Sequence, residues 1–134
     1  MKVFPDTNVW LSGLLGSGLC ARLFDALVMA DCDIIVGESV LEEFFRIAES
    51  KFRMPNDDIT SLIVFMREQT VVPCVEMPME GIPDPDDAPI IAAALAAGAD
   101  LFVTGDKALL ELGQVEGLPI VTPRAAFLTL RGLE

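Results

Sequence analysis

The chain has 134 residues, a mean hydropathy of +0.51 and a formal charge of −12, from nine basic and twenty-one acidic residues. This length fits a single domain over residues 1–134 that can bury a core without disulfides or a structural metal. The negative charge argues against a broad cationic nucleic-acid surface, and the absence of histidine excludes Ser-His and Cys-His nucleophile schemes, so any general base must be a carboxylate, a perturbed lysine or metal-bound water.

The first half of the chain predicts short strands that alternate with helices. Pro5 marks the exit of the first strand, because proline is awkward inside a central strand. Ser39 and Glu42 match the spacing of a capping box at the start of the third helix. In order, the pattern predicts a strand over 2–5, helices over 9–15 and 19–30, a strand over 34–36, a helix from 38 or 39, and a helix over 57–69.

The second half continues the alternation. Pro73 interrupts a strand candidate and makes it an edge strand or a short strand, and Pro89 falls in the first turn of an Ala-rich helix that Gly98 ends. The predicted elements are a strand over 70–75, an irregular segment over 76–83, a helix up to 97, a strand over 101–103, a helix over 107–112, a loop over 113–117, a strand over 118–122 and a terminal helix from Pro123 to about 131. Such alternation predicts an α/β protein with a mostly parallel sheet of four or five strands.

Four acids are expected at the carboxyl edge of this sheet, where ligands bind in open α/β folds. Asp6 and Asp106 each follow an apolar strand, and Asp87 opens the helix before the fourth strand. The fourth acid comes from the helix after the second strand, where Glu42 and Glu43 are adjacent and point about 100° apart. We favour Glu43, and Glu42 is the alternative.

Crowded carboxylates repel one another unless a cation lies between them, and oxygen ligands of this kind select Mg²⁺ or Mn²⁺. Such a site supports attack of metal-activated water on a phosphodiester. The alternative interpretation makes these acids structural, with helix caps at Asp6, Ser39, Asp86 and Asp87 and a solvated face at Glu42 and Glu43. Caps explain less well why Asp6 and Asp106 both end apolar strands.

Cys20, Cys32 and Cys74 are odd in number and lack a CxxC spacing, which favours buried free thiols over a redox or metal role. The N-terminal apolar run is too short for a signal peptide, and no stretch approaches eighteen apolar residues without a charge or a breaker. We therefore expect a cytoplasmic protein without a membrane segment.

Four segments also carry a family resemblance: DTNVWLSGLL at 6–15, ESVLEEFFRI at 38–47, DPDDAPIIAAALAAGADLFVTGD at 84–106 and IVTPRAAF at 120–127. Together they resemble the PIN domain family, specifically the VapC-like toxin components of toxin-antitoxin systems. The resemblance implies a three-layer α/β/α sandwich and a Mg²⁺- or Mn²⁺-dependent ribonuclease with an acidic quartet. It further implies an RNA substrate, a cognate antitoxin protein and a homodimer.

Carried over by position, the quartet is Asp6, Glu43, Asp87 and Asp106, while Asn8, Ser39 and Thr104 match supporting polar positions of the family. Glu43 fits better than Glu42 because the family places an apolar residue after this acid. The chain departs from the family at Pro5, where an aliphatic residue is usual, and at Pro89, just after the third acid.

The only local concentration of positive charge, at Arg46, Lys51 and Arg53, is expected to guide an RNA backbone toward the acids. The alternative function is a catalytically silent PIN-like module that binds RNA or a protein partner. A phosphohydrolase of the haloacid dehalogenase type is disfavoured, because it needs a second aspartate where this chain has Asn8.

Overall fold

A computed structural model describes residues 1–132 of the chain, which form an α/β fold. The alternation of strands and helices expected from the sequence is confirmed. The elements are β1 (Lys2–Pro5), α1 (Thr7–Leu15), α2 (Leu19–Met29), β2 (Asp33–Gly37), α3 (Glu38–Ser50), α4 (Asn56–Met66), β3 (Thr70–Val72), the 3-10 helix η1 (Pro85–Asp87), α5 (Ala88–Ala96), β4 (Leu101–Val103), α6 (Lys107–Leu112), β5 (Gln114–Val115), β6 (Leu118–Val121) and α7 (Pro123–Leu130).

The sheet has the order β3-β2-β1-β4-β6-β5, and every pair is parallel except β5 with β6. From β1 the chain builds outward through β2 and β3, then crosses back to build β4 and β6 on the other side. The strand order therefore reverses at β1, and the crevice for a ligand in such a sheet lies at the carboxyl end of the strands at this point. Asp6 is the residue that follows β1.

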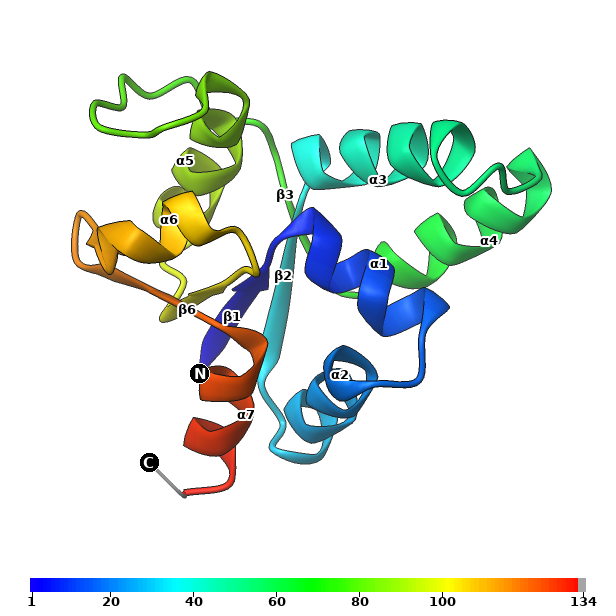
Figure 1. Ribbon diagram of the computed structural model, residues 1–134, viewed down its shortest axis with the longest axis horizontal. Coiled ribbons are helices and arrows are strands. Elements are labelled where there is room, and N and C mark those ends of the chain that lie inside the picture. The colour runs from blue at the N-terminus through cyan, green and yellow to red at the C-terminus, as the bar shows by residue number, and fades with distance from the viewer. Residues whose placement is uncertain (133–134) are drawn as a thin grey trace.

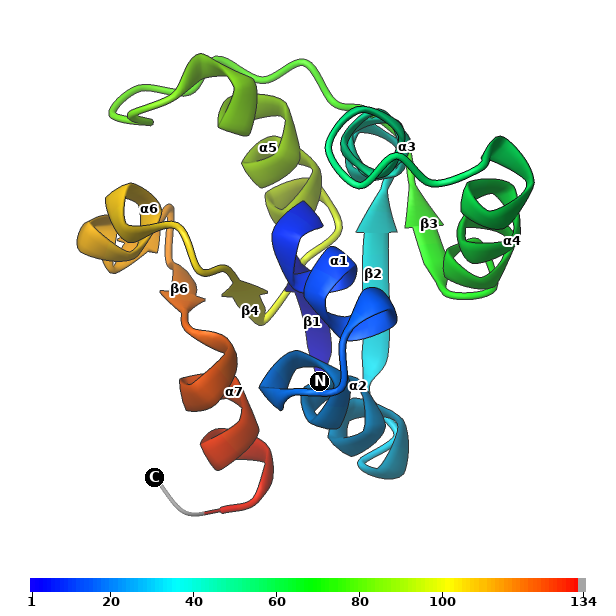
Figure 2. The same cartoon turned by 45° about the vertical axis from the view of Figure 1, so that its right-hand side comes forward.

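Helices cover both faces of the sheet, which confirms the three-layer α/β/α sandwich. Figure 1 shows α5 and α6 on one side and α1 to α4 on the other. Right-handed crossovers that run in opposite directions along the sheet place their helices on opposite faces, which explains this arrangement. Figure 2 shows the last helix, α7, returning beside α2. In the core, the rings of Phe4 and Phe102 stack across β1 and β4, with centroids 5.6 Å apart. This packing holds β1 and β4 together, the two strands that precede Asp6 and Asp106.

Three local expectations need correction. The predicted loop over 113–117 contains β5, a sixth strand, because Glu116 and Gly117 both take positive φ and form the tight turn of a hairpin with β6. The strand expected over 70–75 ends already at Val72, before Pro73, while its expected place as a short or edge strand is confirmed. The capping box is wrong: Gly37 is the N-cap of α3, no side chain caps this helix, and the buried hydroxyl of Ser39 has no hydrogen-bond partner among the described residues.

Two expectations from composition can also be compared with the structure. All three cysteines are free, but only Cys20 and Cys32 are partly buried, and Cys74 is exposed, so the expectation of buried thiols is wrong for Cys74. Within residues 1–132 no single helix is long and apolar enough to cross a membrane, and α1 with α2 meets the length and composition only as a pair bent by 96°.

A glycine inside α1 makes room for the packing of α1 against α2. A Cβ at Gly13 would lie 2.4 Å from two ring carbons of Phe24, whose other neighbour is the ring of Trp10 at a centroid distance of 4.5 Å. In an open helix, Gly→Ala stabilises by about 1 kcal/mol. We expect Gly13→Ala instead to lower the free energy of unfolding by ~1–2 kcal/mol in urea titrations, because Phe24 must leave Trp10.

Two controls separate this clash from a helix effect. In a Phe24→Leu background the ring is absent, and Gly13→Ala should become neutral or stabilising. Gly105→Ala, at a position where a Cβ would have no heavy atom within 4 Å, should be neutral. A Gly13→Ala protein that is more stable than the wild type would contradict the packing described.

Candidate active site

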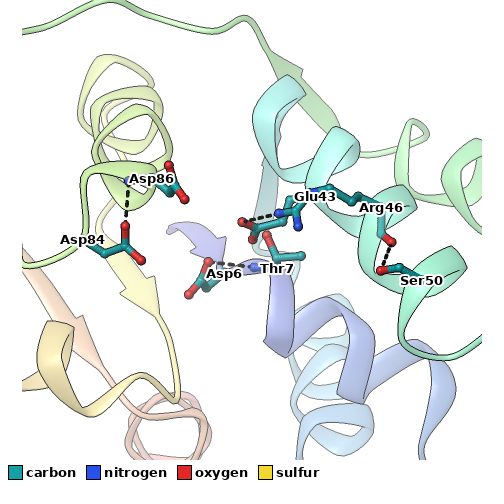
Figure 3. Close-up of polar contacts among 7 residues, drawn as sticks. All are labelled: Asp6, Thr7, Glu43, Arg46, Ser50, Asp84 and Asp86. Carbon is teal, nitrogen blue, oxygen red and sulfur yellow. Dashed lines mark hydrogen bonds and ion pairs between the residues drawn. The ribbon is translucent and has the colours of Figure 1, made fainter.

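Asp6 is the most buried acid at the sheet edge, with 7% of its surface exposed. It caps α1, and its Oδ1 accepts a hydrogen bond of 2.8 Å from the backbone amide of Thr7 (Figure 3). Its Oδ2 accepts a bond of 2.9 Å from the hydroxyl of Thr104. Both oxygens are therefore held in place, and each retains a lone pair for another partner.

The hydroxyl of Thr104 joins two of the acids. Thr104 directly follows β4, is 1% exposed, and donates a backbone hydrogen bond of 3.0 Å to Val121 of β6. Its hydroxyl donates to Asp6 and accepts a bond of 3.1 Å from the backbone amide of Asp106. Asp106 then caps α6, where its Oδ1 accepts from Ala108 at 2.9 Å. The ends of β1 and β4 thus place Asp6 and Asp106 beside each other.

Asp87 lies within electrostatic range of the other three acids of the quartet. Its pKa is raised to about 7, first by burial and then by the charges of the neighbouring carboxylates. Although Asp87 stands at the N-cap position of α5, its side chain makes no capping hydrogen bond. The carboxylates that act on it are those of Asp6, Asp84, Asp106 and Glu43.

Asp84 is the member of this group that sequence reasoning missed. The sequence analysis does not place it among the site acids, and in the structure it caps η1, accepting from the amide of Asp86 at 2.9 Å (Figure 3). Its charge also raises the pKa of Asp87. The signal is present in the run DPDD, since a second carboxylate three residues before Asp87 lies on the same side of a helical turn.

Glu43 is the α3 acid that faces the others. Its side chain is 25% exposed and lies 3.6 Å from a guanidinium nitrogen of Arg46 (Figure 3). Burial raises the pKa of Asp6, the charges of Glu43 and Asp106 add to this, and the hydrogen bonds from Thr104 and Thr7 oppose it. Glu42 lines a different groove with Ser39. The geometry therefore favours Glu43 over Glu42 as the fourth acid.

The chemistry of this donor set fits a hard divalent cation, because it offers carboxylate oxygens and no histidine or thiolate. Burial raises the pKa of Asp6 and of Asp87, and the charges of neighbouring carboxylates, which a cation would offset, raise both further. Within residues 1–132, however, no three of these side chains are close enough together to hold an ion. Binding would require the carboxylates to draw closer than they stand in this structure.

The remaining predicted residues lie outside the acidic group. Asn8 is exposed and makes no hydrogen bond with a site acid in the described part of the chain. It lines a groove with Lys51 instead. Arg53 is exposed and follows Lys51 closely in the chain, and Ser39 lines the other groove, beside Glu42. Of the three supporting polar residues, only Thr104 contacts the quartet.

Comparison with known proteins identifies the family to which this chain belongs. Residues 2–108 match the PIN domain family. No curated protein sequence matches the chain. The fold resembles that of VapBC2 from Rickettsia felis, solved bound to a DNA fragment from its promoter, with a TM-score of 0.65, 13% identity, and coverage of 91% of this chain and 98% of that chain. It also resembles the PIN domain endonuclease Utp24, with a TM-score of 0.55, 18% identity, and coverage of 90% and 84%. The family match spans most of the chain and includes all four acids, and the chain belongs to the PIN domain family.

Proposed function

We propose that this protein is a Mg²⁺- or Mn²⁺-dependent endoribonuclease and the toxin of a toxin-antitoxin pair. The observation that carries the proposal is the position of Asp6, Glu43, Asp87 and Asp106, which act on one another electrostatically at the point where the strand order reverses. A structural role as caps accounts for Asp6 and Asp106 but not for Asp87 or Glu43, whose side chains cap no helix.

Each acid has a role in this proposal. Asp6, Asp87, Asp106 and Glu43 would hold the cation, which when bound supplies an activated water and neutralises charge on the phosphodiester. Thr104 orients Asp6 and, as a donor, favours its charged form, which is the form that binds a cation. The backbone amides of Thr7 and Ala108 fix one oxygen each on Asp6 and Asp106.

The structural neighbours support the nuclease and the toxin assignments separately. Utp24 is described as an endonuclease, and VapBC2 is a complex described with promoter DNA. By analogy with that complex, the partner of this chain would be an antitoxin protein. A homodimer in the cytoplasm is part of the same proposal, and inspection of the adjacent reading frames tests for the antitoxin.

A second candidate is a catalytically silent PIN-like module that binds RNA or a protein without cutting. The observation in its favour is that no three carboxylates among residues 1–132 stand close enough to hold an ion. The two candidates differ in whether neutralising an acid changes cleavage.

The neighbouring glutamates of α3 provide a matched pair for this test. We expect Glu43→Gln, Asp6→Asn and Asp106→Asn to abolish cleavage of an unstructured RNA in Mn²⁺, because an amide cannot supply the charge that holds the cation. Glu42→Gln should retain wild-type activity. EDTA should stop the wild type. Equal cleavage by all of these proteins, or cleavage that survives EDTA, would refute the nuclease assignment.

The same variants report on stability without metal. Asparagine keeps the size and capping ability of aspartate, but the amide nitrogen in Asp6→Asn cannot accept the hydrogen bond from the Thr104 hydroxyl, so Asp106→Asn is the variant that loses repulsion and no hydrogen bond. In EDTA we expect Asp106→Asn to be as stable as the wild type or more stable by up to about 1 kcal/mol, which raises the melting temperature by roughly 3–5 °C. A fall of this size would indicate that the charge of the acid itself stabilises the fold.

The hydroxyl of Thr104 is expected to control cation affinity. Thr104→Val removes the donor to Asp6 and the acceptor for Asp106 at nearly constant volume, so Mn²⁺ affinity measured by calorimetry should fall about 10-fold or more. Thr104→Ser keeps the hydroxyl and should retain the affinity. Equal affinities in the Val and Ser variants would show that the bridge does not orient the ligands.

Asp87 should make the metal-free stability depend on pH. Its pKa of about 7 in the folded chain lies above the ordinary 3.8, so folding binds a proton between these values, and the contribution of Asp87 to stability falls as pH rises through this window. Without metal, Asp87→Asn should match the wild type near pH 4 and exceed it by roughly 1–2 kcal/mol at about pH 8, after allowance for partial exposure.

Urea unfolding of both proteins in EDTA across this pH range measures the difference. Asp86→Asn, at an exposed acid one residue away, is the matched control for an aspartate-to-asparagine change in the same turn. A difference between wild type and Asp87→Asn that does not change with pH would contradict the raised pKa.

A further inference from the structure

A groove between α1 and the end of α3 extends away from the acids. On α1, the residues Asn8, Leu11, Ser12 and Leu15 recur at three- and four-residue spacing and so share one face. The facing wall is formed by Lys51 and Phe52, which follow α3. The groove has a volume of about 440 Å³, and we refer to it as the Phe52 groove.

The Phe52 groove begins beside the candidate active site. Asn8 lies two residues after Asp6 on the helix that Asp6 caps, and it is exposed. With about 1.5 Å of rise per residue, the groove extends roughly 10 Å along α1 from Asn8 to Leu15. Figure 1 shows α1 and α3 leaving the carboxyl edge of the sheet on the same side, and the two helices contact each other. A chain bound at the acids can therefore continue into this groove.

Positive charge lines the same path. Arg46 is paired with Glu43 at 3.6 Å, and its side chain is 69% exposed, so it stands between the acids and the end of α3. Lys51 lines the groove, Arg53 lies two residues further along the chain, and both are exposed. In a chain of net charge −12 these cations form a local site for an anionic backbone beside the acidic group.

Phe52 is a large apolar side chain that remains 48% exposed at this place. The turn that carries it is held by backbone hydrogen bonds from Phe52 to Ile47 at 3.3 Å and from Met54 to Ala48 at 3.1 Å, and Arg53 takes a positive φ of 51°. The ammonium of Lys51 lies 5.9 Å from the ring centroid. An exposed ring fixed in a tight turn and flanked by cations has the chemistry of a stacking platform for nucleic-acid bases.

We propose that the Phe52 groove binds a nucleotide of single-stranded RNA next to the cleaved bond, with its base stacked on Phe52 and its phosphates paired with Lys51 and Arg53. The proposal rests on the ribonuclease function proposed above for the identity of the ligand. Stacking tolerates any base, because every base has a π-face, but it requires a base that is not already stacked and paired in a helix. The groove thus selects single strands with little regard to sequence.

The test measures binding of a fluorescently labelled, unstructured RNA by anisotropy in the Asp106→Asn background, with RNA integrity checked on a gel. Phe52→Leu keeps apolar area but removes the ring, and it should weaken binding about 10-fold, while Phe52→Trp should bind as well as the parent. Phe65→Leu is the matched control, since Phe65 on α4 is 46% exposed and lies outside the groove. It should have no effect.

The ligand is varied in parallel. The same RNA with abasic sites should bind more weakly to the parent and should not respond to Phe52→Leu, and a matched duplex should behave likewise. Lys51→Gln should reduce the salt dependence for normal and abasic RNA alike, by a slope of about one. Equal effects of Phe52→Leu and Phe65→Leu, or an equal loss on abasic RNA, would overturn the stacking proposal.

Cleavage kinetics separate this proposal from the function on which it rests. In the active chain, Phe52→Leu should raise KM with little change in kcat, because the ring binds substrate without touching the reacting atoms. Metal-dependent cleavage with unchanged KM and affinity in Phe52→Leu would refute the groove and leave the nuclease intact. Base-dependent binding through Phe52 without acid-dependent cleavage would refute the nuclease and support the groove as part of a silent RNA-binding module.

Discussion

The hydrogen bonds of the Thr104 hydroxyl join the ends of two central strands. By donating to Asp6 and accepting from the amide of Asp106, this group couples β1 to β4 at the point where the strand order reverses. The stacking of Phe4 on Phe102 supports the register of the same two strands. Because β1 and β4 pack in the core, the carboxylates of Asp6 and Asp106 at their ends are positioned by rigid elements of the fold.

Caps and ligands are not exclusive roles for these acids. Asp6 and Asp106 each satisfy a helix N-terminus with one oxygen, and the positive end of a helix dipole partly offsets the cost of gathering negative charge. Asp87 has no such compensation, since it makes no capping bond, and its raised pKa reflects both its burial and the crowding. The fold thus holds a repulsive group of acids at a cost that a bound cation would remove.

The arrangement also reconciles a strongly acidic protein with the polyanionic substrate proposed for it. The charge of −12 is not spread evenly, because Arg46, Lys51 and Arg53 lie along α3 and its following turn. Helices α1 and α3 extend from the carboxyl edge of the sheet on the same side, and the groove between them is lined by Lys51 and Phe52. Local placement, rather than net charge, decides which partners such a surface accepts.

The sequence by itself determined the order of strands and helices, the parallel α/β class and the acids that end β1 and β4, because hydrophobic periodicity, proline and glycine act over a few residues and can be recognised locally. The tertiary structure alone decided three further points. It placed the charge of Glu43 within electrostatic range of Asp6, which depends on how α3 is rotated against the sheet, and it left Ser39 without a capping role because Gly37 begins that helix. It also brought Asn8 together with Phe52, residues far apart in the chain whose proximity depends on the packing of α1 against α3 and on no local pattern.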